Sequence, residues 1–483
     1  MRKPNEFNSV SWLRRTFPIR LVKTILQTIA FTISSLGLPL NSPAQPALLN
    51  VLHSFDVSPD GASPVTPLAL GSNHKLYGTT SAGGTNSSGV LFSMNLDGTA
   101  YLILHHFDTG NGTPNGGGVI EGLDLRLYGT TSLGTDNGGT VFSVQRDGQN
   151  FTVLHTFTNG PDGSRPMGEF TQASDGVLFG VTHDGGLGDG TIYSMNPDGS
   201  GYQVLYSFHK VPDGSQPSAG LLLSGGMLYG TTGAGGATSG GGGTVFKISP
   251  AGTGYQVLHS FTNQPDGYAS AARLVQGSDG ALYGTTVAGG TASHGTVFKL
   301  DTDGNNFTIL HSFTNTPDAV RPDSGVVRGW DNALYGTTFF GGGGGPPGFG
   351  AIYRVFENGT GYQVVYAFTN TVYGYEPYAA LAQGPSTPGS AGIFYGMTES
   401  GGSFGNGVVF GLVVNPPLSI TPVSSGPTLF WPAWAINYTL QHTTNLTSGP
   451  WTTVTNGAPI TGVQLPDNAT NSSADFYRLI WLP

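Results

Sequence analysis

A unit of five residues, Leu-Tyr-Gly-Thr-Thr or a close variant, recurs seven times in this chain and constrains its fold more than any other feature. Successive copies lie 50–60 residues apart and begin at Leu76, Leu127, Leu178, Leu228, Leu282, Leu334 and Phe394. A second unit of the type Leu-His-Ser-Phe also occurs seven times, beginning at Leu52, Leu104, Leu154, Leu205, Leu258, Leu310 and Val365. A fixed period of this kind indicates one structural unit repeated in space.

One period reads as four short strands. In the fifth copy they are the runs Ala271–Val275, Leu282–Thr286, Thr296–Leu300 and Thr308–Phe313, which are separated by turns rich in Gly and Asp-Gly. Four antiparallel strands in a period of about 50 residues are typical of a propeller blade. The sequence therefore predicts an all-β fold, with a seven-bladed β-propeller over residues 45–414.

The phase of the repeat indicates how the ring closes. The repeats begin with a lone fourth strand, Leu49–Phe55, and end with a set of three strands between Tyr378 and Val414. We expect the N-terminal strand to complete the seventh blade, because closure removes the exposed sheet edges of an open array.

Residues 1–44 have a different composition from the repeats. Six basic residues precede or begin the apolar stretch Thr24–Leu40, and small residues stand at Ser42 and Ala44. This pattern predicts a secretory signal peptide cleaved near Ala44, which leaves no transmembrane segment in the mature chain. An uncleaved membrane anchor is the alternative, but Thr, Ser and Gly interrupt the apolar stretch.

The charge balance excludes some classes of partner. Residues 1–44 hold six of the 18 basic and one of the 28 acidic residues, so 12 and 27 remain, a net charge of −15. Nucleic acid and anionic membrane surfaces are therefore unlikely partners. The chain has no cysteine, which excludes disulfides, thiol nucleophiles and Cys-based metal sites. An exported chain without disulfides suits a bacterial envelope protein.

The repeat stops after Asn415-Pro416-Pro417, and residues 415–483 form a separate module. Its expected strands are Thr428–Trp431, Asn437–His442, Trp451–Val454 and Phe476–Trp481. We predict a small β-sandwich-like domain with a possible role in sorting or attachment.

Five histidines share one position of the repeat, at His53, His105, His155, His259 and His311, and Tyr206 and Tyr366 fill the same position in two other copies. Positions related by the repeat lie far apart around a ring, and tyrosine is a poor ligand for divalent metals. These residues are therefore interpreted as packing and hydrogen-bonding residues between blades. No metal site, cofactor site or catalytic motif is expected.

Function in a repeat protein is expected where the repeat is broken, on the loops of one face. The irregular residues, taken as candidate ligand-binding residues, are Arg165, His183, Asp184, Arg321, Phe339, Phe340, Tyr373, Tyr375, Glu376, Tyr378 and Glu399. Aromatic rings beside carboxylates suit a neutral sugar chain, which offers C–H faces and hydroxyl groups. At each position, ordinary packing among loop residues is the competing interpretation.

The repeat, read as Leu-Tyr-Gly-Thr-Thr, Gly-Thr-Val-Phe, Asp-Gly and Val-Leu-His-Ser-Phe, resembles that of the bacterial "choice-of-anchor tandem repeat GloVer-containing" proteins over about residues 50–414. The resemblance implies an exported protein whose repeats present a surface and whose C-terminal segment attaches it to the envelope. It implies no catalytic residues. The C-terminus ends in Trp481-Leu482-Pro483, without the hydrophobic helix and basic tail of a simple anchor.

Three functions follow from these features. The favoured one is a binding or scaffold protein of the cell surface or extracellular space that recognises a polysaccharide or a surface protein. A purely structural or adhesive envelope protein is the second. A glycan-degrading enzyme is the third, and Glu169, Asp184, Glu376 and Glu399 would be its candidate carboxylates.

Overall fold

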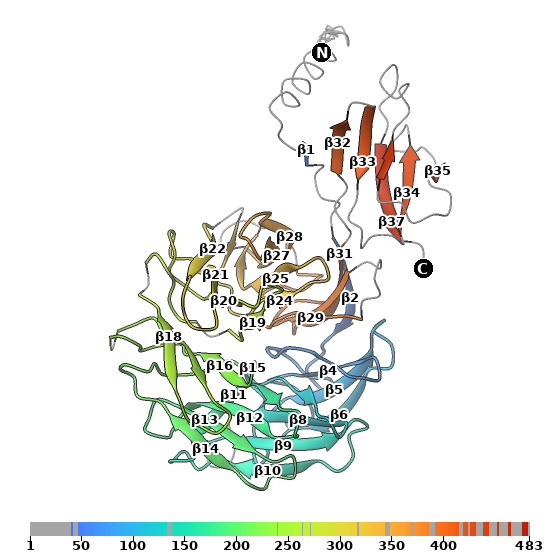
Figure 1. Cartoon of the computed structure of the whole chain (residues 1–483). Helices are drawn as coiled ribbons and strands as arrows, with labels where there is room; N and C mark the ends of the chain where they lie inside the picture. The colour runs from blue at the N-terminus through green and yellow to red at the C-terminus, as the bar shows by residue number, and fades with distance from the viewer. Residues whose placement is uncertain are drawn as a thin grey trace, which may run out of the picture. The chain divides into compact units, whose positions relative to one another are not determined.

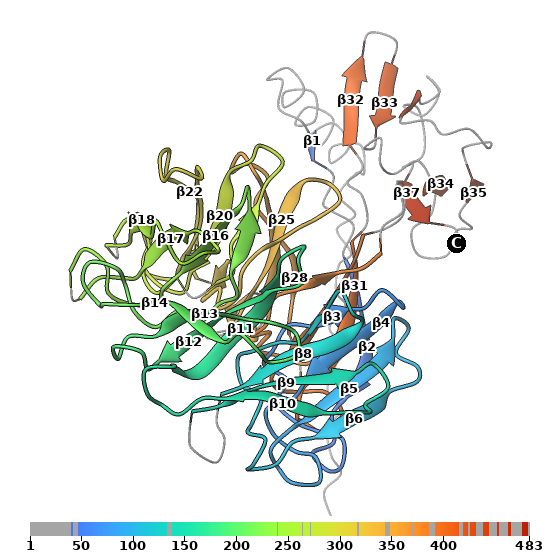
Figure 2. The same ribbon diagram turned by 60° about the horizontal axis from the view of Figure 1, so that its bottom comes forward.

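Each repeat folds into a sheet of antiparallel strands, and seven four-stranded sheets follow one another around a ring in the computed structural model (Figures 1 and 2). The structure describes residues 47–414, apart from 133–137, 239, 263, 271, 316–317, 343–347, 370 and 386–391, together with short strands of a second unit. No helix occurs in this described part of the chain. The arrangement is a seven-bladed β-propeller, as the repeat predicts.

The strands of a blade are called A to D from the innermost outward. Blade one consists of β3 (Ala69–Leu70), β4 (Lys75–Thr79), β5 (Val90–Asn95) and β6 (Leu102–His106). Blade two consists of β7 (Ile120–Glu121), β8 (Arg126–Thr131), β9 (Thr140–Gln145) and β10 (Thr152–Thr156). Blade three consists of β11 (Ser164–Gln172), β12 (Leu178–Asp184), β13 (Thr191–Met195) and β14 (Gln203–Ser207), and blade four of β15 (Leu222–Ser224), β16 (Met227–Thr231), β17 (Thr244–Ile248) and β18 (Gln256–Ser260).

Blades five to seven consist of β19 (Val275–Gln276), β20 (Leu282–Thr286), β21 (Thr296–Leu300) and β22 (Thr308–Ser312); β24 (Val327–Arg328), β25 (Ala333–Thr338), β27 (Ala351–Phe356) and β28 (Gln363–Ala367); and β29 (Ala382–Gln383), β30 (Gly392–Thr398), β31 (Val408–Val414) and β2 (Leu48–Ser54). Strand β2 pairs antiparallel with β31, so a strand from the start of the repeats lies in the sheet of the last. A short pair, β23 (Ala319–Val320) and β26 (Phe340–Gly341), lies outside these sheets.

Two kinds of glycine fit the repeat together. The glycine of the Asp-Gly turn between strands C and D has a positive φ, and at Gly304 a Cβ would meet the Leu258 carbonyl oxygen of the previous blade at 2.7 Å. The glycine of the Leu-Tyr-Gly unit makes room for an aromatic ring on strand C. A Cβ on Gly284 would lie 2.5 Å from Cζ of Phe298. Only glycine fits at both positions, because any other residue would bring its Cβ into a clash.

The apolar core lies between neighbouring blades. One buried cluster joins Tyr229 and Val245 of blade four to Leu282 and Phe298 of blade five, and similar clusters join other blades. Each blade therefore completes the core of the next, which is the packing mode of repeat architectures.

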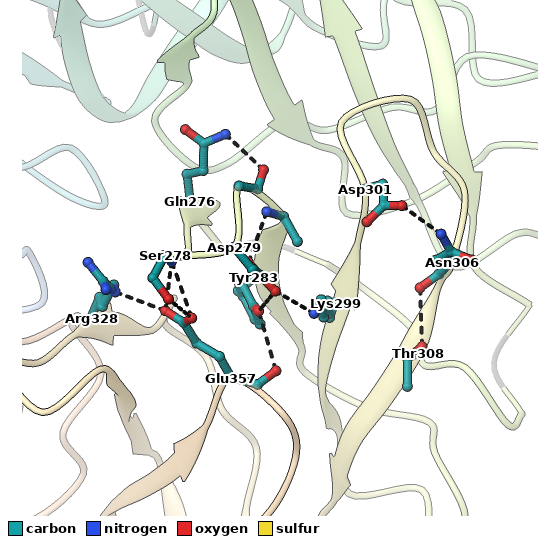
Figure 3. A network of polar contacts seen from close by, with 12 residues as sticks. Gln276, Ser278, Asp279, Tyr283, Lys299, Asp301, Asn306, Thr308, Arg328 and Glu357 are labelled. Atoms are coloured by element: carbon teal, nitrogen blue, oxygen red, sulfur yellow. Dashed lines mark hydrogen bonds and ion pairs between the residues drawn. The ribbon is translucent and has the colours of Figure 1, made fainter.

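Polar networks at the A–B turns add to these contacts (Figure 3). In blade five the backbone N–H of Ser278 donates to Glu357 of blade six at 3.0 Å, and Glu357 also accepts from Nε of Arg328 at 2.8 Å. Asp279 of the same turn accepts from the Tyr283 hydroxyl at 2.8 Å and pairs with Lys299.

The residues outside the propeller belong to a second unit, which spans Met1–Gln45, Pro388–Ser390 and Pro416–Pro483. Its strands form two sheets, in the orders β1 (Leu40–Asn41), β32 (Ser419–Val423), β33 (Gly426–Phe430), β36 (Gly462–Gln464) and β35 (Thr452–Thr453), β34 (Tyr438–Thr443), β37 (Phe476–Trp481). Residues 1–39, which include most of the expected signal peptide, lie outside the described residues.

Candidate functional site

Residues from all seven blades line one cavity of about 520 Å³ around the propeller axis. The innermost strands and the D–A loops, which lead into them, supply most of its wall. Its apolar lining includes Leu68, Leu222, Leu274, Val327 and Leu381. The charged and polar side chains at this cavity decide what it can hold.

The D–A loops place one residue of each blade at the edge of the cavity in a characteristic conformation. In six blades this residue has a φ between 51° and 60°, which side chains other than glycine rarely adopt, and it is Ser63, Arg165, Gln216, Ala269, Arg321 or Glu376. Each donates its backbone N–H to a carbonyl of the preceding blade, as Arg321 does to His294 at 3.1 Å. The same backbone geometry is thus built six times.

A second residue, at the end of strand B, lies across from the first. The N–H of Phe339 donates to the Arg321 carbonyl at 2.9 Å, and the N–H of Glu399 donates to the Glu376 carbonyl at 3.0 Å. We call the seven pairs of facing residues the rim pairs: Ser63–Ser81, Thr113–Ser132, Arg165–His183, Gln216–Gly233, Ala269–Val287, Arg321–Phe339 and Glu376–Glu399.

The rim pairs differ in chemistry from blade to blade. Blades one, two, four and five carry small or uncharged residues, whereas blades three, six and seven carry Arg165–His183, Arg321–Phe339 and Glu376–Glu399. One regular backbone therefore presents an irregular set of side chains, and the large ones gather on three blades.

In blade three the rim pair is joined by a neighbouring carboxylate. Asp184 accepts from Arg165 Nη1 at 2.9 Å and lies 2.8 Å from Nδ1 of His183. Arg165 and His183 both line the cavity. Arg165 stays 45% exposed, so its remaining N–H groups can reach a ligand.

In blade six an aromatic cluster surrounds the rim arginine. The Arg321 guanidinium lies 4.8 Å from the ring centroid of Phe339 and 5.4 Å from that of Phe340. Its Nη2 donates to Asp323 at 2.7 Å. Phe339 also makes an edge contact with Tyr378 of blade seven, whose ring lines the cavity. The two rings are 4.6 Å apart, so both lie on the same side of the Arg321 guanidinium, which they and Asp323 hold in place.

Burial changes the protonation of two acids beside this cluster. It raises the pKa of Asp323 to about 6, although the Arg321 ion pair opposes the shift. Burial, and then the neighbouring Glu376, raise the pKa of Glu399. Both carboxyl groups therefore keep a proton to a higher pH than an exposed carboxyl group does.

A bulge in β11 narrows the cavity from blade three. The pairing of β11 with β12 shifts register between Met167 and Thr171, and the bulged segment carries Glu169. Glu169 accepts from Nη1 of Arg273 at 3.0 Å. This ion pair joins blades three and five along the cavity wall.

The structure brings most of the predicted residues to one site. Arg165, His183 and Tyr378 line the cavity; Arg321, Phe339, Glu376 and Glu399 belong to the rim pairs; Asp184 and Phe340 contact them. Tyr375 packs against Phe349 at 5.6 Å. Tyr373 is 41% exposed in the same loop, three residues before the rim residue Glu376. Asp323 and Arg273 are missed by the sequence reasoning, although Asp323 stands two residues after a rim residue.

The described residues lack two kinds of feature, a cluster of metal ligands and a membrane-spanning helix. They include no group of three or more His, Asp or Glu side chains placed to hold a metal ion. No helix in the same part of the chain is long and apolar enough to cross a membrane.

Comparison with known proteins identifies the repeat. The model of the Gloeobacter/Verrucomicrobia repeat matches residues 42–242, 133–343 and 236–418. No curated protein matches the chain.

Several solved structures resemble it at low identity. An oligogalacturonate lyase in complex with manganese matches at 10% identity and a TM-score of 0.49, over 78% of this chain and 99% of its own. An extracellular domain assigned to a hybrid two-component system of B. thetaiotaomicron matches at 12% and 0.49, over 91% and 57%. A nidogen/laminin complex matches at 12% and 0.39, over 63% and 96%. At these scores we infer nothing about function from them.

Proposed function

The chain belongs to the Gloeobacter/Verrucomicrobia repeat family, and from that premise we propose that it is a binding protein that holds part of a neutral glycan at the rim pairs and the cavity. The observation that carries this proposal is the contrast among the rim pairs. Each rim residue with a positive φ costs about 1 kcal/mol of backbone strain relative to glycine. Blades three, six and seven nevertheless place charged side chains there, Arg165, Arg321 and Glu376.

The chemistry of the site supports a sugar. Arg165 and Asp323 line the cavity and offer hydrogen-bond donors and acceptors, respectively, and the rim pair Glu376–Glu399 adds further acceptors. Phe339 and Tyr378 add aromatic surface for C–H groups. A cavity of about 520 Å³ has the size of a small-ligand site. The acidic chain would repel polyanions.

Three further features belong to the same proposal. Export would follow from cleavage near Ala44, and the module over residues 415–483 would attach the protein to the cell surface. Strand β2 would close the ring by its pairing with β31. These features would present the rim pairs to polymers outside the cell.

The experiment is affinity electrophoresis of the purified chain in a panel of soluble neutral polysaccharides, with assay of reducing sugar. We expect retardation by one class of polymer and a dissociation constant about tenfold weaker in Phe339→Ala, because one aromatic contact is lost. Val287→Ala is the matched control, since Val287 holds the same rim position in blade five. An equal effect of the two changes, or no retardation of the wild type, contradicts the proposal. Release of reducing sugar would favour an enzyme.

A further inference from the structure

Exposed apolar side chains gather on three loops beside the rim pair of blade seven. Val372 and Tyr373 are 63% and 41% exposed on the loop between β28 and β29, and Phe404 is 59% exposed on the loop between β30 and β31. Val57, on the loop after β2, is 46% exposed. We call these four side chains the apolar platform.

Hydrogen bonds fix the three loops to one another. The N–H of Gly402 donates to the Thr371 carbonyl at 2.6 Å, which ties the Phe404 loop to the Val372 loop. On its other side, the N–H of Ser63 donates to the Asn406 carbonyl at 3.0 Å. The platform therefore stands on a connected backbone, and a ligand would order little of it on binding.

Two members of the platform occupy unusual positions. Val57 has a φ of 49°, a conformation that β-branched residues avoid. Tyr373 stands where other D–A loops carry an aspartate bonded to the neighbouring strand D, as Asp318 is to His311 at 3.2 Å. At this position blade seven has an aromatic ring that is 41% exposed; burial, and then the hydroxyl of this ring, raise the pKa of Tyr366.

The charges and apolar side chains of the three loops indicate which ligand the apolar platform would bind. Residues 54–64, 368–378 and 398–408 contain no Lys or Arg and four acidic residues, so a polyanion would be repelled. Four side chains also fall short of the roughly 20–30 residues per side of a stable protein interface. Aromatic and aliphatic surface without positive charge suits the C–H faces of uncharged sugar rings.

The platform is continuous with the rim. The N–H of Tyr375 donates to the Ser400 carbonyl at 2.9 Å, and Tyr375 lies between Tyr373 and the rim residue Glu376 in the chain. We propose that the apolar platform is an outer subsite for a neutral polysaccharide, which binds the sugar units that extend from the rim. This inference rests on the proposed function and adds that a chain, rather than a single sugar, is recognised.

The test is a titration of the full chain with short and long oligosaccharides of the polymer that retards it. We expect affinity to rise with length in the wild type. In Phe404→Ser the long oligosaccharides should bind about tenfold more weakly while the shortest bind as before. Leu187→Ser is the matched control, because Leu187 is 65% exposed on the equivalent loop of blade three. Thermal melting of each variant checks folding.

Length-independent binding, or an equal effect of Phe404→Ser on short and long oligosaccharides, overturns the outer subsite while leaving the proposed function intact. An effect of Leu187→Ser as large as that of Phe404→Ser does the same. If no oligosaccharide binds the wild type at any length, the proposed function fails and the outer subsite fails with it.

Discussion

Two positions lie three residues apart in the D–A loops, and they behave in opposite ways from blade to blade. The first is aspartate in five loops, whereas the second varies among serine, arginine, glutamine and alanine in the same loops. The pairs are Asp60 and Ser63, Asp162 and Arg165, Asp213 and Gln216, Asp266 and Ala269, and Asp318 and Arg321. Both positions have a repeated backbone, so the difference concerns what their side chains contact.

The first position holds neighbouring blades together. Its carboxylate bonds to a histidine or tyrosine on strand D, as Asp266 does to Nε2 of His259 at 2.9 Å and Asp213 to the Tyr206 hydroxyl at 2.6 Å. That ring stacks on an aromatic residue of the next blade at six junctions, with centroids 3.4–4.0 Å apart. The histidines therefore have the packing role expected from the sequence.

The second position lies within three residues of the cavity lining, and in blade three its side chain, Arg165, lines the cavity. Its backbone N–H and carbonyl make the contacts that the fold needs, and its side chain is left to vary. The comparison teaches that regularity in this chain marks contacts between blades, whereas irregularity on the same backbone marks candidate ligand contacts.

The largest loss of stability is expected at the blade junction that lacks a stacked pair of aromatic rings. At the blade that contains β2, Leu49 stands where other blades place the stacked aromatic ring, and the first repeat segment is held by strand pairing with β31 and by the burial of Leu49 and Phe55. Deletion of Leu49–Phe55 should leave an unpaired edge and yield aggregated protein, measured by size-exclusion chromatography. A chain shortened only to residue 45 is the control. A monomer with unchanged melting temperature would show that the ring does not need this strand.

A smaller loss of stability should distinguish the aspartate position of the D–A loop from the rim position. Asp266→Ala should lower the free energy of unfolding by about 2 kcal/mol, because His259 and the N–H and hydroxyl of Thr262 lose their acceptor. Ala269→Gly, three residues later, should change it by less than about 0.5 kcal/mol, since its φ of 58° is one that glycine adopts freely. Denaturant unfolding of both variants measures the difference. Equal losses would break the distinction between packing and rim positions.

The sequence predicts the outer strands well and the inner ones poorly. The structure has strands at Leu282–Thr286 and Thr296–Leu300, as expected, but the expected strand Ala271–Val275 is only Val275–Gln276. Innermost backbones approach one another at the axis, where a Cβ on Gly325 would meet the Arg273 carbonyl oxygen at 2.5 Å, and this crowding limits regular pairing.

The same reasoning applies to the site. Loop irregularity identifies the rim residues of blades three, six and seven, since each departs from its counterparts in the other repeats. The Glu169–Arg273 pair joins residues 104 apart through the bulge of β11, and no local pattern encodes it. The burial that raises the pKa of Asp323 likewise depends on the packing of the folded chain rather than on neighbouring sequence.

The smallest predicted effect concerns pH at one junction. Burial lowers the pKa of His105 to about 4, and its ring stacks on Phe151 at 3.7 Å. Because the unfolded histidine titrates near 6.5, the unfolded state binds more protons below that pH. The stability that the neutral ring contributes is therefore present above pH 6.5 and lost as the pH falls towards 4.

His105→Phe keeps the stacked ring and removes the titration. Its free energy of unfolding should fall less than that of the wild type between pH 7 and pH 4.5, measured by denaturant unfolding at both values. Arg165→Gln, at the rim, is the control and should follow the wild-type slope. If His105→Phe and the wild type lose stability in parallel, the folded protein does not lower the pKa of His105, and the acid lability comes from other groups.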